Sequence, residues 1–145
     1  MDAKLPQNTT VGFIGLGRMG NPMARNLRRG DYKVVGYDIR EEAVAALAGV
    51  GVAGARSVAE VGERADVVIT MVPDSQAVEE VALGPEGLIH RMAGGKVCVD
   101  MSSSYPASTE KVGKILAERG IGMLGAPVTG GVAGAEGASL TIMVG

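Results

Sequence analysis

The chain has 145 residues, of which 46% are hydrophobic and 21% are charged, and its formal charge at pH 7 is −2. These values are typical of one folded globular domain, and the lack of a basic excess argues against nucleic acid or an anionic membrane as a partner. One cysteine and one histidine exclude a disulfide framework within the chain and a metal site built from those residues.

Short apolar runs alternate along the chain with segments of helical spacing. Residues 11–15 end in glycine and predict a buried strand, and residues 19–29 predict a helix that ends at Gly30. We then expect a strand over 33–38, a helix over 41–48, a short strand over 51–53 and a helix over 57–64, with Ser57 as its N-cap.

Residues 66–72 are the clearest strand in the sequence: they are β-branched and apolar on both faces, which predicts a central parallel strand covered on both sides. We expect further elements in this order: a helix over 75–83, a helical turn or two over 85–92, a strand over 96–101, a helix over 106–119, and strands over 121–126 and 140–144. Alternating strands and helices with short connections predict a doubly wound, mostly parallel α/β sheet. Because the last predicted strand has no helix to cover it, we interpret residues 1–145 as one domain that is truncated at its C-terminal end.

A glycine-rich turn lies between the first predicted strand and the first predicted helix. It has the G-x-G-x-x-G pattern, in which Gly15 permits the tight turn, Gly17 lets a pyrophosphate approach the backbone and Gly20 lets the helix pack against the sheet. The helix N-terminus favours the anion. A turn that binds no ligand is the alternative. We predict that the whole turn binds a dinucleotide, through Gly15, Leu16, Gly17, Arg18, Met19 and Gly20.

An acidic residue follows at the distance that this pattern requires. Asp38 lies 18 residues after Gly20, at the end of the second predicted strand. A carboxylate there would accept hydrogen bonds from both ribose hydroxyls and repel a 2′-phosphate, so we expect NAD in preference to NADP. Arg40 could neutralise such a phosphate, which leaves NADP open. The alternative role for Asp38 is the N-cap of the next helix.

Four stretches resemble, in chain order, the motifs of the β-hydroxyacid dehydrogenase family, which includes 3-hydroxyisobutyrate dehydrogenase and tartronate semialdehyde reductase. The first, residues 13–27, resembles the N-terminal signature of that family (Phe-Ile-Gly-Leu-Gly-Arg-Met-Gly-Asn-Pro-Met-Ala-Arg-Asn-Leu). The others are residues 70–73 (Thr-Met-Val-Pro), residues 100–103 (Asp-Met-Ser-Ser), and residues 126–135 followed by 140–145. The resemblance covers nearly the whole chain and implies a Rossmann-type domain.

The resemblance also implies cofactor contacts after the later strands. Met71, Val72 and Pro73 would line the path of the ribose and nicotinamide, and Ser103 would contact the cofactor. A hydrogen-bonded turn at the end of the strand is the alternative for Ser103.

The substrate carboxylate has its own implied site. The resemblance assigns it to Ser102 and to the loop Thr129-Gly130-Gly131, and consecutive glycine amides can indeed form an anion-binding nest. A strand-end turn is the alternative for Ser102, and a flexible surface loop is the alternative for residues 129–131.

The resemblance implies an oxidoreductase that moves a hydride between NAD(P) and a small 3-hydroxy acid or semialdehyde. Members of the family are about twice as long, and their acid/base lysine lies in an all-α C-terminal domain that this chain lacks. The lysines Lys96, Lys111 and Lys114 occur in other contexts, so we expect no catalytic residue here and no activity from this chain alone. We expect the full-length protein to be a homo-oligomer. A non-catalytic dinucleotide-binding or scaffold module and an imine reductase-like enzyme are the alternatives.

The sequence also bears on where the protein resides. No segment approaches the ~20 apolar residues that span a bilayer. The polar residues 1–10 lack the basic and then apolar pattern of a secretory signal. We therefore expect a cytoplasmic protein with no membrane partner.

Overall fold

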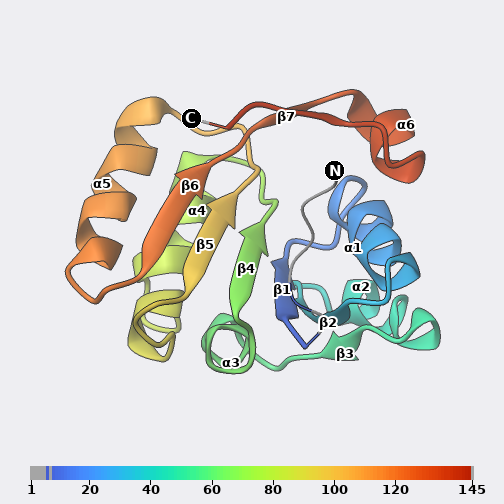
Figure 1. Cartoon of the computed structure of the whole chain (residues 1–145), viewed down its shortest axis with the longest axis horizontal. Helices are drawn as coiled ribbons and strands as arrows, with labels where there is room; N and C mark the ends of the chain where they lie inside the picture. Colours follow the sequence, from blue (N-terminus) through green and yellow to red (C-terminus); the bar gives the residue numbers. More distant parts are fainter. Residues whose placement is uncertain (1–5, 7, 145) are drawn as a thin grey trace.

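A computed structural model of the chain describes residue 6 and residues 8–144. Six parallel strands form the main sheet, in the order β3-β2-β1-β4-β5-β6 (Figure 1). They are β1 (Thr10–Ile14), β2 (Lys33–Tyr37), β3 (Ala53–Gly54), β4 (Val67–Thr70), β5 (Val97–Asp100) and β6 (Gly122–Gly125). The predicted doubly wound α/β fold is confirmed. The strand order reverses between β1 and β4, and a crevice at such a point is where ligands bind in open α/β sheets.

Helices lie on both faces of this sheet. They are α1 (Gly20–Arg29), α2 (Glu41–Ala45), α3 (Val58–Arg64), α4 (Ser75–Leu83), α5 (Pro106–Ala117) and α6 (Gly131–Glu136), with short 3₁₀ turns η1 (Ala48–Val50) and η2 (Leu88–His90). One buried cluster joins α3, α4 and α5 to the sheet around Val68 and Cys98, and a second joins α1 and α2 to it around Phe13 and Val34. Successive side chains of a strand point to opposite faces, so each face has its own core.

Local signals set several element boundaries as expected. The Ser57 hydroxyl accepts a hydrogen bond from the Glu60 N–H at 3.1 Å, which confirms the predicted cap of α3. Gly30 is the C-cap of α1, with Arg28 and Arg29 in the last turn. The predicted helix over 41–48 is shorter and continues into η1, and the segment 85–92 contains only the 3₁₀ turn η2.

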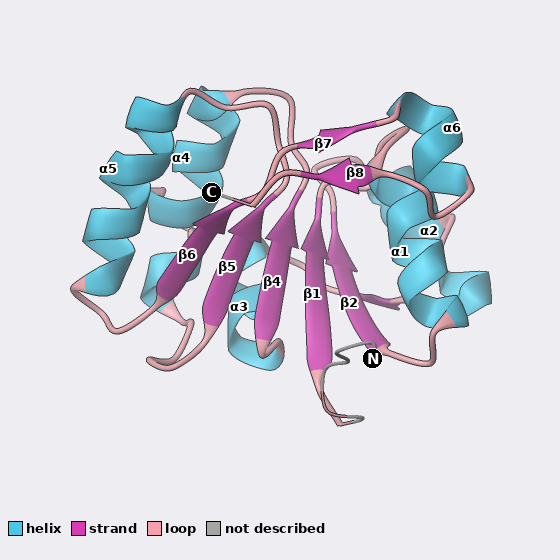
Figure 2. Cartoon of the chain, turned by 45° about the horizontal axis from the view of Figure 1, so that its top comes forward, coloured by secondary structure: helices cyan, strands magenta, loops and turns pink. Residues whose placement is uncertain are grey.

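The C-terminal part of the described chain differs from the prediction. The expected strand over 140–144 is the two-residue β8 (Thr141–Ile142), and it lies outside the main sheet. It pairs antiparallel with β7 (Val128–Thr129), and α6, between the two strands, was not predicted. This ribbon crosses above the carboxyl ends of the main strands (Figure 2). Two-residue strands are too short for an alternating pattern, and the Gly- and Ala-rich α6 has almost no apolar periodicity.

Burial determines the chemistry of the single thiol. Cys98 is buried in the middle of β5, as its position in an apolar run predicts. Burial, together with the negative charge of Asp100, raises the pKa of Cys98 to about 12. The thiol therefore stays protonated at neutral pH and behaves as a small apolar side chain. The part of the chain that the structure describes contains no helix that is both long enough and apolar enough to cross a membrane.

Candidate functional site

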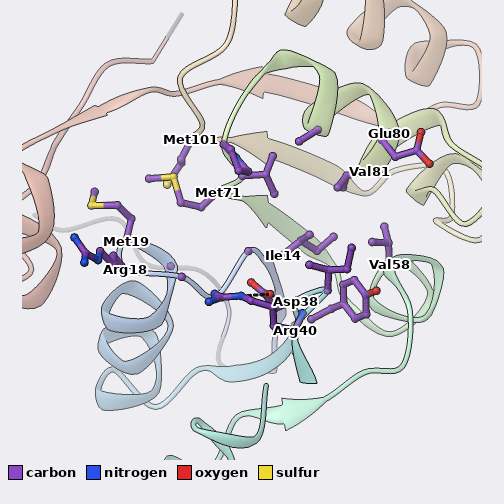
Figure 3. Close-up of a pocket in the computed structure, with 18 of the residues that line it drawn as sticks. Ile14, Arg18, Met19, Asp38, Arg40, Val58, Met71, Glu80, Val81 and Met101 are labelled. Carbon is purple, nitrogen blue, oxygen red and sulfur yellow. Dashed lines mark hydrogen bonds and ion pairs between the residues drawn. The ribbon is translucent and has the colours of Figure 1, made fainter. Parts of the chain in front are cut away.

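A cavity of about 800 Å³ lies at the carboxyl ends of the main strands, where the strand order reverses (Figure 3). The loops after β1, β2, β4 and β5 all contribute to its wall, together with Val128 of β7 and side chains of α3 and α4. Parallel strands bring these loops to one edge of the sheet, although they are up to 88 residues apart in the sequence.

The three glycines of the turn after β1 differ in what surrounds them. Gly15 has a φ of +99°, and a Cβ there would collide with the carbonyl oxygen of Met71. A Cβ on Gly20 would collide with the carbonyl oxygen of Gly15 and lie 3.1 Å from the Phe13 ring. A Cβ on Gly17 would meet only the Arg40 guanidinium, at 3.6 Å. The fold thus requires Gly15 and Gly20 to be glycine, whereas the space beside Gly17 is open to a ligand.

Asp38 connects the ends of β1 and β2. Its Oδ2 accepts a hydrogen bond from the Leu16 N–H at 2.8 Å, and its Oδ1 accepts one from the Arg40 N–H at 2.9 Å. The structure does not show the alternative role of Asp38 as a helix cap, because Arg40 occupies the N-cap of α2 and makes no side-chain cap bond. These bonds fix the direction of the carboxylate, and only 10% of the side chain is exposed.

The charge of Asp38 is stabilised in place. Partial burial by itself raises the pKa of the carboxyl group. The hydrogen bonds from the backbone N–H groups of Arg40 and Leu16, and then the Arg40 guanidinium, outweigh burial, so the pKa of Asp38 lies below its ordinary value. The wall of the cavity therefore carries an ionised carboxylate at neutral pH.

Arg40 adds a positive charge beside this carboxylate. Its Nε donates to Asp38 Oδ1 at 3.2 Å, as the dashed line in Figure 3 shows, and 55% of the side chain is exposed. The same guanidinium lies over Gly17. Backbone N–H groups hold the Asp38 carboxylate, whereas the Arg40 guanidinium lies at the end of a long, exposed side chain. A ligand can therefore displace the guanidinium more easily than the carboxylate.

The loops after β4 and β5 form the opposite side of the cavity. Met71, Val72, Pro73 and Ser103 all line it, as do Arg18 and Met19 from the glycine-rich turn. Figure 3 shows Met71 and Met101 on the side of the cavity opposite Asp38 and Arg40. The structure thus brings together around one cavity segments that the sequence analysis had assigned to one ligand.

Three kinds of predicted site residue lie outside the wall of the cavity. The Leu16 side chain is buried in the core, and Leu16 contributes to the site only through its N–H, which donates a hydrogen bond to Asp38. Ser102 is 2% exposed, and its hydroxyl accepts a hydrogen bond from the Val72 N–H. The residues after the wall residue Val128 are exposed and do not line the cavity; they are Thr129, Gly130 and Gly131.

The sequence analysis missed part of the apolar wall. Ile39, Val58 and Val81 line the cavity from the end of β2, from α3 and from α4, and Glu80 lies beside Val81. Ile39, which is 88% exposed, directly follows Asp38 in the sequence. Of these apolar wall residues, it is the one that its position in the sequence could have indicated. Val58 and Val81 had no such signal, because each looks like an ordinary position on an amphipathic helix.

Comparison with known proteins places this geometry in a family. The model of the family described as "NAD binding domain of 6-phosphogluconate dehydrogenase" matches residues 10–145. Over 97% of its length the chain is 43% identical to 2-(hydroxymethyl)glutarate dehydrogenase of Eubacterium barkeri, and covers 47% of that protein. Over 94% of its length it is 42% identical to 3-hydroxyisobutyrate dehydrogenase of Pseudomonas aeruginosa, and covers 46% of it.

A solved structure agrees with these relatives. The structure of 3-hydroxyisobutyrate dehydrogenase of Mycobacterium tuberculosis with L-serine superimposes with a TM-score of 0.88 at 36% sequence identity. The match covers 94% of this chain and 46% of the other. The chain therefore spans about half the length of the relatives it matches.

Proposed function

The chain belongs to the family of the NAD-binding domain of 6-phosphogluconate dehydrogenase and the β-hydroxyacid dehydrogenases, and from this we propose that its large cavity binds NAD in preference to NADP. The observation that carries the proposal is the Asp38 carboxylate, which backbone N–H groups hold ionised at the end of β2, beside the open space at Gly17. Such a carboxylate suits two ribose hydroxyls and opposes a 2′-phosphate.

The residues around the cavity fit a dinucleotide from end to end. The amides at the start of α1 and the open Gly17 suit the pyrophosphate, and Asp38 suits the adenosine ribose. The apolar side chains of Ile39, which follows Asp38 in the chain, and of Val58, in the same cavity wall, suit the adenine. The nicotinamide end then extends to the opposite side, where Met71–Pro73 and Ser103 line the cavity.

We extend the proposal to the reaction class of the relatives. Two of them are named for the oxidation of hydroxy acids, which supports a small 3-hydroxy acid or semialdehyde as the substrate of the whole protein. The backbone N–H groups of Thr129, Gly130 and Gly131, which follow the wall residue Val128, would hold the substrate carboxylate. Ser102 is less suited to this role, because its hydroxyl is bonded to the backbone of the β4 loop.

The cofactor supplies the hydride chemistry when bound, and this chain binds and orients it. In this proposal the acid/base lysine that balances the proton comes from the half of the family's length that the chain does not span. Lys96 and Lys111 have other partners here, since Lys96 donates to backbone carbonyl groups in the last turn of α3 and Lys111 pairs with Glu79.

Calorimetric titration of the chain with NADH and with NADPH tests the cofactor proposal. We expect tighter binding of NADH. In Asp38→Asn the difference should shrink or reverse, because the amide no longer repels phosphate and Arg40 loses its partner. Binding of neither nucleotide would contradict the cofactor role, and tighter binding of NADPH to the unmodified chain would contradict only the preference.

A further inference from the structure

A buried carboxylate that the proposed site does not use lies behind the cavity wall. Asp100, the last residue of β5, is 1% exposed, and among the described residues no cation forms an ion pair with it. Its Oδ1 accepts hydrogen bonds from Thr70 Oγ1 at 2.9 Å and from the Ser102 N–H at 3.0 Å. Its Oδ2 accepts one from Ser104 Oγ at 2.9 Å. Burying a carboxyl group without a counter-ion costs free energy, even when three hydrogen bonds compensate part of that cost. The presence of Asp100 at this position therefore requires an explanation.

The donors to Asp100 belong to the ends of two neighbouring strands. Thr70 ends β4 and immediately precedes the β4 loop, residues 71–73, whereas Ser102 and Ser104 lie in the β5 loop, residues 101–104. A further bond joins the loops directly, because the Val72 N–H donates to Ser102 Oγ at 2.9 Å, and Ser102 Oγ in turn donates to the Thr70 carbonyl oxygen at 3.4 Å. We call Thr70, Asp100, Ser102 and Ser104 the Asp100 cluster.

The cluster lies behind the cavity-lining residues on one side only. Ser103, between two residues of the cluster, faces the cavity, and so do all three residues of the β4 loop. On the other side, Asp38 is held by the N–H groups of Leu16 and Arg40, and none of its hydrogen bonds involves the Asp100 cluster. The side-chain hydrogen bonds therefore fix the two sides of the cavity separately.

We propose that Asp100 is a positioning residue for the nicotinamide side of the cavity. It holds the β4 and β5 loops at the separation at which Val72, Pro73 and Ser103 can contact the cofactor, and it does not touch the cofactor itself. This inference rests on the proposed function, since it assigns the adenosine half of the cofactor to the Asp38 side and the nicotinamide half to the β4 and β5 loops.

Two substitutions separate hydrogen bonding from charge. Asp100→Ala leaves two hydroxyls and one N–H without their acceptor in a buried position, so the loops should relax. Asp100→Asn keeps an oxygen for Thr70 and Ser102, and its amide can donate to Ser104 Oγ, whose own hydrogen can turn to Thr109 Oγ1, 3.2 Å away. The asparagine variant should therefore behave like the unmodified chain.

The test compares two probes on the 145-residue chain. ADP carries the adenosine and the pyrophosphate but neither the second ribose nor nicotinamide, whereas NADH carries all of them. We expect Asp100→Ala to weaken NADH binding about tenfold, the effect of one to two lost buried hydrogen bonds, and to leave ADP affinity unchanged within about twofold. Asp100→Asn should restore NADH affinity. Calorimetry measures both constants.

A matched control lies on the same strand and face. Cys98 is buried two residues before Asp100 and has no polar contact with the loops, so Cys98→Ala removes core volume without touching the cluster. It should lower the unfolding temperature but not the ratio of NADH to ADP affinity. If Asp100→Ala does not fold, Ser104→Ala, which removes only the donor to Oδ2, provides the same comparison.

Amide hydrogen exchange, measured without any cofactor, provides a second test. The amide hydrogens of Val72 and Ser102 should exchange faster in Asp100→Ala, or in Ser104→Ala, than in the unmodified chain and in Asp100→Asn, as nuclear magnetic resonance would detect. Three results would overturn the inference. The first is that Asp100→Ala leaves amide exchange unchanged, and the second is that it weakens ADP and NADH binding equally. The third is that Cys98→Ala shifts the ratio of NADH to ADP affinity as much as Asp100→Ala does. If the unmodified chain binds neither probe, the proposed function itself is wrong, and the positioning role is rejected with it.

Discussion

At the scale of single residues, the glycine-rich turn separates folding from binding. Gly15 and Gly20 lie so close to neighbouring carbonyl groups that no side chain fits, whereas Gly17 has only the displaceable Arg40 guanidinium nearby. The sequence pattern treats the three glycines alike, because the pattern records only their spacing. Their different surroundings lead to different expectations for substitution.

Gly17→Ala should fold with little change in stability and bind NADH at least tenfold more weakly, because the new methyl group occupies the place of the pyrophosphate. Gly20→Ala should instead lower the free energy of unfolding by about 2 kcal/mol or more, because its methyl group overlaps the turn before α1. Urea denaturation and calorimetric titration of both variants measure the two effects. Equal loss of stability in both would show that Gly17 is also required by the fold.

The lowered pKa of Asp38 predicts a pH-dependent contribution to stability. Since the pKa in the folded chain lies below that in the unfolded chain, ionised Asp38 stabilises the fold at pH values above its ordinary pKa. That contribution is lost as the pH falls through the lowered pKa. Asp38→Asn should therefore destabilise the chain more at pH 7 than at pH 3, as thermal unfolding at both values would record. A difference independent of pH would show that the charge of Asp38 does not contribute.

At the scale of secondary-structure elements, the strand order creates the site. Because β1 lies between β2 and β4, the turn after β1 faces Asp38 on one side and the β4 loop on the other. Most elements that build this arrangement were predictable, since each has a local signal such as the Ser57 cap or the glycine that ends α1. α6 and the β7–β8 ribbon lacked such a signal and were missed.

The cap of α3 is a test of one such local signal. Ser57→Ala removes the acceptor for the Glu60 N–H and should lower the free energy of unfolding by about 1 kcal/mol. Ser57→Asp, which keeps an oxygen acceptor at the same position, serves as the control and should lose much less. Urea denaturation at an unchanged m-value measures both. An alanine variant as stable as the unmodified chain would mean that water replaces the cap without cost.

At the scale of the whole molecule, apolar side chains remain exposed near the C-terminal ribbon. Ile142, Met143 and Val144 are all exposed, as is Leu124 at the edge of the main sheet. No lysine of the described residues lines the large cavity. Since the resemblance assigns the acid/base lysine to the half of the family's length that the chain does not span, we propose that this chain binds the cofactor without catalysing the reaction.

The 145-residue chain should bind NADH yet show no NAD-linked oxidation of 3-hydroxyisobutyrate, serine or glycerate. The physical reason is that no lysine of the described residues lines the cavity, and the acid/base lysine that the family resemblance implies lies in the half of the relatives' length that this chain does not span. Absorbance of NADH formed with each substrate measures the rate, with the Pseudomonas aeruginosa 3-hydroxyisobutyrate dehydrogenase as a positive control. Turnover comparable with the control would show that the proton-transfer group lies within this chain.

The doubly wound sheet, the glycine-rich turn and the position of Asp38 at the end of β2 were all predictable from the residues alone. Apolar periodicity, helix caps and the spacing of glycines act between residues that are near one another in the chain, so they can be recognised without coordinates. The inward direction of Ser102, and the link that Asp100 makes between two loops about 30 positions apart in the sequence, became visible only in the folded chain. The same is true of the Arg40 guanidinium, which lies over Gly17. These contacts depend on which strands become neighbours, and no local pattern of residue types specifies the distance between two strand ends.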